Sequence, residues 1–590
     1  MGKQLKERRS KDAGAPPLAV ARGRCAALRH VARAWAETLG EENRGSDVAG
    51  FVLEAMETYE EARRTGAASE PHAERPQPET QLARSAGEAA LSLPMVEALH
   101  WLTSLYSGLI APERRSRLGA FYTPPALVAR LLDQAQEAGL DWATARVLDP
   151  AAGGAAFLVQ AAERMRRALP DCEPAFVLAQ IGSRLKGLEL DGHAARIGQR
   201  ALEIALADLA VDAGRPAPTM IAEADSLAIE PRPEYDLVVG NPPYGRISLS
   251  AKDRERFNRS LYGHANLYGI FTDLALRWTR PNGLIAFLTP TSVLSGRYFS
   301  ALRTLVAREA PPVAIDFVHA RRGVFEDVQQ ETMLAVYRKD GETRRAQIHY
   351  IHVDNAADTR VIRNGTVGLP ACAAAPWLAP RQAEHSELIA NAERMPCRLA
   401  DLGYRVATGP LVWNRFKKQL RDKPGRNAHP LIWVEAVGTD GLFRFRAEKK
   451  NHKLFFALEP GDDWLLVTEA AVLVQRTTAK EQRRRIIAAE LPATFIAAHQ
   501  GVVVENHLNM IVPVGKPKVA PKLLAALLNS EVVDQLFRCI SGSVAVSAFE
   551  LEALPLPRPD AFRPLAANLA KGADRTMLDR VCLQLYGPPA

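Results

Sequence analysis

The end of one apolar segment carries the strongest chemical signal in this sequence. The run Tyr235–Gly240 has the composition of a buried strand, and it is followed directly by Asn241, Pro242, Pro243 and Tyr244. Two consecutive prolines have no backbone N–H, so this turn presents acceptors, namely the Asn241 side-chain oxygen and the Pro242 carbonyl. Both oxygens can receive hydrogens from one amino group, which turns the nitrogen lone pair toward an incoming methyl group. Tyr244 can then stack on the ring that carries the amine.

Three further segments carry residues suited to binding a nucleoside. Residues 149–158 form an Asp-Pro loop rich in Ala and Gly between an expected strand and an expected helix, where a ligand can approach backbone amides. Glu189 ends the next expected strand and can accept both hydrogens of a ribose diol, and Asp225 can accept from the amine of an adenine. Glu189 lies about twice as far along the chain as the ~20 residues typical of a nicotinamide-binding motif, which argues against such an enzyme.

Strands that alternate with helices must hold these loops together. Between about 115 and 340, apolar runs, polar turns and amphipathic segments repeat, which predicts βαβ units and a mostly parallel sheet. The expected strands are 146–148, 185–190, 235–240, 284–288, 313–318 and 333–337. In such a sheet the carboxyl ends of the strands share one edge, so the four segments should meet there.

Composition sets the broad class of the protein. Of 590 residues 47% are hydrophobic and 24% charged, and 75 basic side chains face 67 acidic ones, for a net charge of +8. This mild excess permits a polyanionic partner without requiring one. The six cysteines are scattered, so neither a disulfide framework nor a metal site is expected. No apolar segment follows the basic first residues, so no secretory signal is expected, and no apolar run reaches ~18 residues. These features predict a cytoplasmic protein with no membrane segment.

Taken together, these motifs resemble the gamma-class N6-adenine DNA methyltransferases of restriction–modification or related defence systems. The resemblance implies S-adenosyl-L-methionine as cofactor. It implies catalytic roles for Asn241, Pro242 and Tyr244, and stacking on the target base by Tyr244 and by Phe325 of the segment 323–328. The residues that it implies for the cofactor are Tyr122, Thr123, Asp149, Ala151, Gly153, Glu189, Asp225 and Asn241.

The cofactor loop departs from the family pattern at two positions. Ala152 stands where the family often has Cys, and Ala155 stands where it usually has a second Gly. The second change adds a methyl group to the loop. A protein with weakened cofactor binding is therefore an alternative.

The resemblance also implies the architecture. The expected fold class is α/β, a class I (Rossmann-like) methyltransferase sheet, mostly parallel and twisted, with helices on both faces, plus a C-terminal α+β domain. The expected division is a helical N-terminal segment at 1–65, a Pro-rich polar linker at 66–94, the methyltransferase domain at 95–395 and a target-recognition domain at 396–590.

The C-terminal region carries three basic runs interleaved with aromatic residues, a composition suited to phosphate and base contact. The predicted DNA-binding residues are Arg415, Lys417, Lys418, Lys449, Lys450, Lys453, Arg483, Arg484 and Arg485.

The resemblance therefore implies methylation of adenine N6 in double-stranded DNA. Adenine in RNA, cytosine N4 and protein glutamine are alternative substrates, and a catalytically impaired DNA-binding specificity protein is the alternative outside enzymes. No nuclease motif is evident, so no endonuclease is expected in this chain. The resemblance allows a separate restriction or defence subunit as a partner, which the N-terminal helices could dock.

Overall fold

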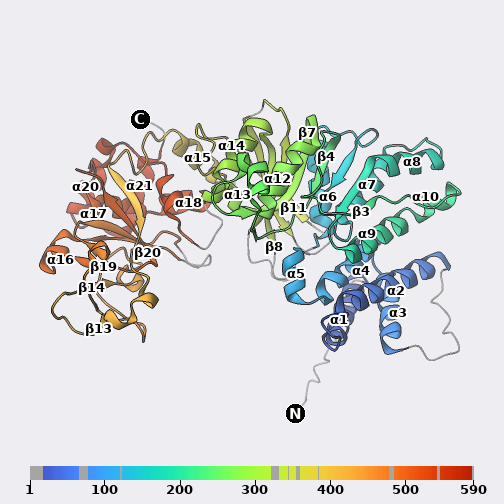
Figure 1. The fold of residues 1–590 in the computed structure, drawn as a ribbon. Coiled ribbons are helices and arrows are strands. Elements are labelled where there is room, and N and C mark those ends of the chain that lie inside the picture. The colour runs from blue at the N-terminus through green and yellow to red at the C-terminus, as the bar shows by residue number, and fades with distance from the viewer. Residues whose placement is uncertain are drawn as a thin grey trace, which may run out of the picture.

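The computed structural model describes residues 17–65, 77–119, 122–320, 331–342, 344–353, 359–382, 384–477, 484–540 and 545–587. Figure 1 shows a helical N-terminal layer, a central domain built on a large sheet, and a C-terminal domain at the opposite end of the molecule. Within these described ranges, no helix has the length and apolar character needed to span a membrane.

The N-terminal layer is packed onto the central domain. Helix α3 approaches α2 closely, because a Cβ at Gly87 would lie only 2.4 Å from the carbonyl oxygen of Ala55. Apolar residues of this layer share a continuous core with helices of the central domain. The helices are α1 (Pro17–Glu37), α2 (Arg44–Thr65), α3 (Pro78–Ala90), α4 (Met95–Leu109) and α5 (Pro112–Leu118).

Part of the predicted linker 66–94 is a helix. Pro78 occupies the first turn of α3, where its missing N–H costs no hydrogen bond, and the buried face of the helix consists mainly of alanine. The polar, Pro-containing composition concealed this short Ala-rich face. Residues 66–76 of the same interval lie outside the described residues.

The central sheet has nine strands in the order β11-β10-β8-β9-β7-β4-β1-β2-β3. β1 pairs in parallel with both β2 and β4, and β4 in parallel with β7. β9 is antiparallel to its neighbours β7 and β8, and β10 and β11 extend the sheet. The strands are β1 (Val147–Asp149), β2 (Leu185–Glu189), β3 (Ile221–Glu223), β4 (Tyr235–Gly240), β7 (Thr279–Pro290), β8 (Pro312–Ala320), β9 (Thr332–Arg338), β10 (Arg345–Val353) and β11 (Thr359–Gly368).

Both faces of this sheet are covered, as expected for parallel strands. Val147 and Leu237 face the core shared with the N-terminal layer, whereas their neighbours Leu148 and Val238 face a second core on the other side. This alternation explains why the central strands are continuously apolar. The helices are α6 (Pro125–Glu137), α7 (Ala156–Arg167), α8 (Pro174–Arg184), α9 (Gly192–Ala205), α10 (Ala207–Asp212), α11 (Ala251–Arg256), α12 (Leu267–Trp278), α13 (Ser292–Ser295) and α14 (Ser300–Glu309).

The C-terminal domain combines two small sheets with a helical cluster. The sheets have the orders β12-β20-β17-β18 and β13-β15-β14-β19-β16. The strands are β12 (Tyr404–Thr408), β13 (Leu420–Arg421), β14 (Ala428–Ile432), β15 (Phe455–Ala457), β16 (Leu466–Val467), β17 (Ala471–Gln475), β18 (Ala488–Leu491), β19 (Val502–Val504) and β20 (Leu508–Pro513). The helices are α15 (His385–Glu393), α16 (Ala493–Ala498), α17 (Pro521–Leu528), α18 (Glu531–Ile540), α19 (Ala548–Glu552), α20 (Arg563–Ala570) and α21 (Arg575–Leu585).

Candidate cofactor and catalytic site

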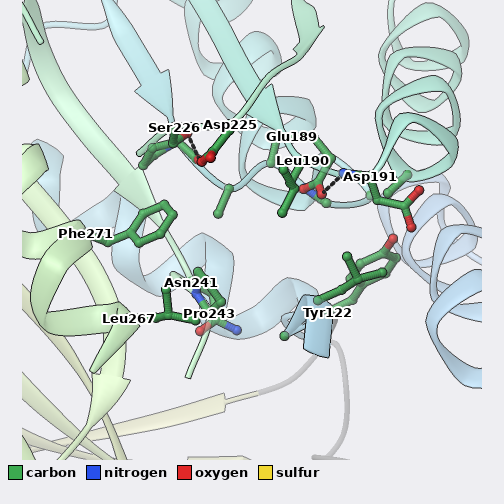
Figure 2. A pocket seen from close by; sticks show the side chains of 18 of the residues that line it. Tyr122, Glu189, Leu190, Asp191, Asp225, Ser226, Asn241, Pro243, Leu267 and Phe271 are labelled. Atoms are coloured by element: carbon green, nitrogen blue, oxygen red, sulfur yellow. Dashed lines mark hydrogen bonds between the residues drawn. The ribbon is translucent and has the colours of Figure 1, made fainter. Parts of the chain in front are cut away.

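A cavity of about 290 Å³ opens at the carboxyl ends of β1, β2 and β4. The strand order reverses at β1, so the loops after β1 and β4 diverge there and leave a crevice, as at the ligand sites of other doubly wound sheets. Figure 2 shows Asp225 and Glu189 on one side of this pocket and Asn241 and Pro243 across from them. The four segments that the sequence singled out therefore meet at one pocket.

The loop after β1 packs closely against the ring of Tyr122. Gly153 has φ +50°, and a Cβ on it would lie 3.0 Å from Cε1 of Tyr122. A Cβ at Gly154 would lie 2.8 Å from both Tyr122 and Thr103. Both positions therefore require glycine, and Tyr122 forms one wall of the pocket.

Ala155 does not add bulk to the pocket. It has φ +62° at the start of α7 and is fully buried. Its Cβ points toward Gly198 of α9, since a Cβ placed on that glycine would lie 3.4 Å from it, and Ala155 is absent from the residues that line the cavity. The departure from the family pattern costs about 1–2 kcal/mol of backbone strain but leaves the ligand space unchanged.

The two acids opposite Asn241 are fixed by backbone groups. The Glu189 carboxylate accepts from the Gly153 N–H at 2.7 Å and from the Asp191 N–H at 2.9 Å. Burial raises the pKa of this carboxyl. Asp225 is exposed and accepts from the Leu227 N–H at 2.9 Å. The pocket thus offers carboxylate oxygens to hydroxyl or amine donors.

Asp149 is a buried acid at the end of β1. Its Oδ1 accepts from the Ala151 N–H at 3.0 Å, and its Oδ2 has no hydrogen-bond partner within the described part of the chain. Burial raises the pKa of Asp149 to about 8. Gly240 makes room for it, because a Cβ there would lie 2.7 Å from Oδ1.

The Asn-Pro-Pro-Tyr segment begins with a fixed carboxamide. Asn241 Nδ2 donates to Oγ1 of the buried Thr123 at 3.1 Å, which leaves Oδ1 as the end of the amide turned away from Thr123. Gly119, with φ +62°, allows the chain to pass close to Pro243, since a Cβ there would be 2.5 Å from that ring. The role of Thr123 as a cofactor ligand stays a prediction, and the structure shows its hydroxyl holding the Asn241 amide.

Of the two predicted stacking residues, Tyr244 and Phe325, the structure describes only Tyr244. Tyr244 is half-buried, packs edge-to-face on Tyr268 with 5.9 Å between ring centroids, and is not part of the cavity lining. Burial raises the pKa of Tyr244 well above its ordinary value, so the phenol stays neutral. Phe325 lies outside the described residues. Stacking of either ring on a base stays a prediction.

Sequence reasoning missed residues that carry no motif. Phe271 and Leu267, one turn apart on α12, form an apolar wall of the pocket. Tyr106 of α4 also lines it and donates to Asp191 Oδ2 at 2.7 Å. The helical spacing of these residues could have indicated only burial, and their place at the site depends on how α4 and α12 pack.

The predicted DNA-binding cations differ in solvent exposure and in ion pairing. Lys453 pairs with Asp422 at 2.8 Å, and Arg484 pairs with Asp579 at 3.0 Å. Arg485 is only 3% exposed, so the prediction that it contacts DNA phosphate is wrong, because its chain enters the buried run that leads into β18. Arg483 lies outside the described residues. The exposed members are Arg415, Lys417, Lys418, Lys449 and Lys450.

A sheet of this order, with a ligand pocket at its strand-order reversal and a glycine-containing loop after β1, defines the class I methyltransferase fold. This confirms the predicted fold class. The solved structure of the Type IIL restriction–modification enzyme MmeI in complex with DNA aligns with a TM-score of 0.50 and 14% identity, covering 97% of this chain and 94% of that one. At that identity, the likeness concerns the fold alone.

Comparisons of the amino-acid sequence show which methyltransferases this chain is similar to. The family model for the Eco57I restriction-modification methylase matches residues 212–325. The Type II methyltransferase M.PstI of Providencia stuartii is 27% identical over 379 residues, 62% of this chain and 73% of that protein. M.BsuBI of Bacillus subtilis is 26% identical over 356 residues, 58% and 68% of the two proteins. The chain is therefore similar to methyltransferases of restriction–modification systems, and this similarity confirms the resemblance expected from the sequence.

Proposed function

We propose that this DNA methyltransferase transfers a methyl group from S-adenosyl-L-methionine to N6 of an adenine flipped out of duplex DNA. The observation that carries the proposal is the Asn241 carboxamide, held by Thr123 beside the Pro242 carbonyl, at a pocket whose other side presents Glu189 and Asp225. These groups place two acceptors for an amine next to a nucleoside-sized cavity.

The residues present fit this cofactor. The hydroxyl of Tyr122 and Oδ2 of Asp149 are buried polar atoms without a hydrogen-bond partner in the described residues, and buried polar groups normally have one. Glu189 would hold the ribose, Asp225 the adenine, and the loop with Ala151 and Gly153 the remainder. The cofactor supplies an electrophilic methyl group on a sulfonium sulfur.

The chain's own contribution is to orient the target amine. Asn241 Oδ1 and the Pro242 carbonyl accept its two hydrogens, so its lone pair points along the axis of displacement. These acceptors gain strength as positive charge develops on nitrogen, and the proton leaves after the new bond has formed. No base with a shifted pKa is required, and catalysis is mainly positioning.

The target base must first leave the duplex, which costs a few kcal/mol. The exposed cations of the C-terminal domain support phosphate contacts that offset this cost. They also favour DNA over a protein glutamine as substrate, because a glutamine side chain offers no phosphate.

Analysis of the methylated product tests this proposal. The full chain is incubated with methyl-labelled S-adenosylmethionine and mixed-sequence duplex DNA, and the DNA is digested to nucleosides for mass spectrometry. We expect label in N6-methyl-2′-deoxyadenosine only. Label in N4-methyl-2′-deoxycytidine, or transfer to RNA or protein instead of DNA, would contradict the adenine assignment.

A further inference from the structure

A group of exposed cationic and aromatic side chains lies on the catalytic domain just beyond Asn241–Tyr244. It is formed by β5 (Arg246–Ile247), α11, the turn before β6 (Ala265–Asn266) and the short helix Arg297–Phe299. We call it the Arg–Tyr patch. Its members are Arg246, Arg254, Tyr262, His264, Arg297 and Tyr298.

The aromatic rings of the patch are held by their neighbours. The Arg246 guanidinium lies 5.9 Å from the Tyr298 ring centroid, and that of Arg297 lies 5.6 Å from the Tyr262 centroid. Arg297 Nη2 also donates to Tyr262 Oη at 3.1 Å. Gly263, with φ +71°, sits against Tyr298, since a Cβ there would be 3.0 Å from the ring. The rings of Tyr262 and Tyr298 are exposed to solvent, and these contacts within the protein hold them in position.

The patch is strongly positive. Arg246, Arg254 and Arg297 form no ion pair with the residues that the structure describes, although each makes a ring or carbonyl contact. Two acids flank Arg254 in sequence. Asp253 accepts from the Ser250 hydroxyl at 2.6 Å and Glu255 accepts from the Asn258 amide at 3.0 Å, and among the described residues neither forms an ion pair with an arginine of the patch. Three unneutralised guanidiniums beside two exposed rings favour a partner with both phosphates and flat bases.

The patch is structurally joined to the site. On β5, Ile247 lines the cavity, while its neighbour Arg246 reaches Tyr298. Tyr244 contacts Tyr268, and Tyr268 stacks on Phe299 at 4.9 Å, the residue after Tyr298. The patch therefore borders the catalytic segment rather than lying on a remote surface. In Figure 1, α12, α13 and α14 lie on the side of the central domain nearer the C-terminal domain.

We propose that the Arg–Tyr patch binds the DNA strand that carries the flipped adenine. Its guanidiniums contact the phosphates that flank the extruded nucleotide, and Tyr298 or Tyr262 stacks on an adjacent unpaired base. This inference rests on the proposed function, because it assigns the approach of the substrate strand to the same site. It adds DNA contacts on the catalytic domain to those expected on the C-terminal domain.

The charge component is tested by the salt dependence of binding. The full-length Arg246→Ala/Arg297→Ala variant is titrated with a fluorescent 30-base-pair duplex of arbitrary sequence across a salt series. We expect the slope of log K against log salt to fall by about 1.8, as two phosphate contacts are lost. Arg166→Ala is the control, since Arg166 is an exposed cation at the far end of α7 from the cofactor loop. Equal slopes for the double variant and the control would overturn the proposal.

The stacking component is tested with a duplex in which one adenine faces an abasic site and is easily extruded. We expect Tyr298→Ala to weaken binding of this duplex roughly ten-fold, with little change for the fully paired duplex, and Tyr298→Phe to bind like the parent. An equal loss on both duplexes, or no loss, would contradict stacking at Tyr298.

Calorimetric titration with S-adenosylmethionine separates the two proposals. Unchanged cofactor affinity in all patch variants is expected, and a loss of that affinity would mean that the patch acts on the cofactor instead of on DNA. If the parent chain bound no cofactor but the salt slopes still differed, the proposed function would fail while the DNA contact stood.

Discussion

At the scale of single residues, the account depends on how Asn241 is held. Its proposed role as an amine acceptor could be predicted from four consecutive residues, because a strand that ends in two prolines leaves few donors. Its hydrogen bond to Thr123 could not, since the two residues are separated by 118 positions and meet only when α6 and β4 pack. The hydrogen bond from Tyr106 to Asp191 could not be predicted either, because these residues are also far apart in the sequence.

Thr123 provides the test of that positioning. Replacing it with Val removes the hydroxyl that receives the Asn241 amide hydrogen, and we expect kcat to fall by about ten-fold or more, because misplaced catalytic groups are costly. Thr123→Ser should restore most of kcat. If the Val variant changed only the KM for the cofactor, Thr123 would be a cofactor ligand and not a positioning residue.

Asp149 yields a pH prediction. Its pKa is raised from an ordinary 3.8 to about 8 in the fold. The stabilising effect of its protonated form is thus complete below pH ~4 and is lost as the pH rises toward 8. Asp149→Asn keeps an oxygen that accepts from the Ala151 N–H. Because its side chain does not ionise, the variant does not lose stability as the pH rises. In urea unfolding without cofactor, we expect the variant to gain stability relative to the parent between pH 5 and 8, by up to about 1.4 kcal/mol per pH unit. A pH-independent difference would contradict a buried, neutral Asp149.

At the scale of elements, the central strands β1, β2, β4, β7, β8 and β9 lie where continuous apolar runs predicted them. The outer strands β3, β10 and β11 were not predicted, because they carry exposed polar residues and their pairing is decided by neighbours distant in sequence. The alanine-rich face of α3 was also missed. The loops that line the pocket could be located from the sequence because they follow the buried strands.

The loop between β1 and α7 allows a direct test of the Ala155 departure. Because the Ala155 methyl faces Gly198 and not the cavity, we expect Ala155→Gly to leave the cofactor Kd within about two-fold of the parent value, as measured by calorimetry. Relief of the positive φ and loss of a buried methyl act in opposite directions on stability. A large gain in cofactor affinity would show that the methyl does obstruct the ligand.

At the scale of the whole molecule, one arginine links the catalytic and C-terminal parts. Arg303 on α14 is fully buried and donates to the carbonyls of Val293 at 3.0 Å, Gly296 at 2.7 Å and Ala375 at 3.1 Å. Its guanidinium also lies 5.7 Å from the ring centroid of Phe549 in α19. Burial lowers the pKa of Arg303 to about 10, which leaves it charged at neutral pH. The relative placement of the central and C-terminal domains depends on such contacts, which no local sequence pattern revealed.

Arg303→Leu should therefore leave several buried carbonyls unpaired. We expect a loss of about 3 kcal/mol in the free energy of unfolding, measured by chemical denaturation. Arg308→Leu, on the exposed side of the same helix, should change it by no more than about 0.5 kcal/mol. Equal effects of the two substitutions would contradict a structural role for the buried guanidinium.

The central claim, that Asn241 presents an adenine amine for methylation, is tested most directly by mapping modified bases in DNA from a host that expresses the chain. Long-read sequencing would compare the parent with Asn241→Ala, whose cofactor affinity is measured in parallel. We predict N6-methyladenine at a fixed sequence motif with the parent and none with the variant, which still binds the cofactor. Equal adenine modification by both proteins would contradict the account.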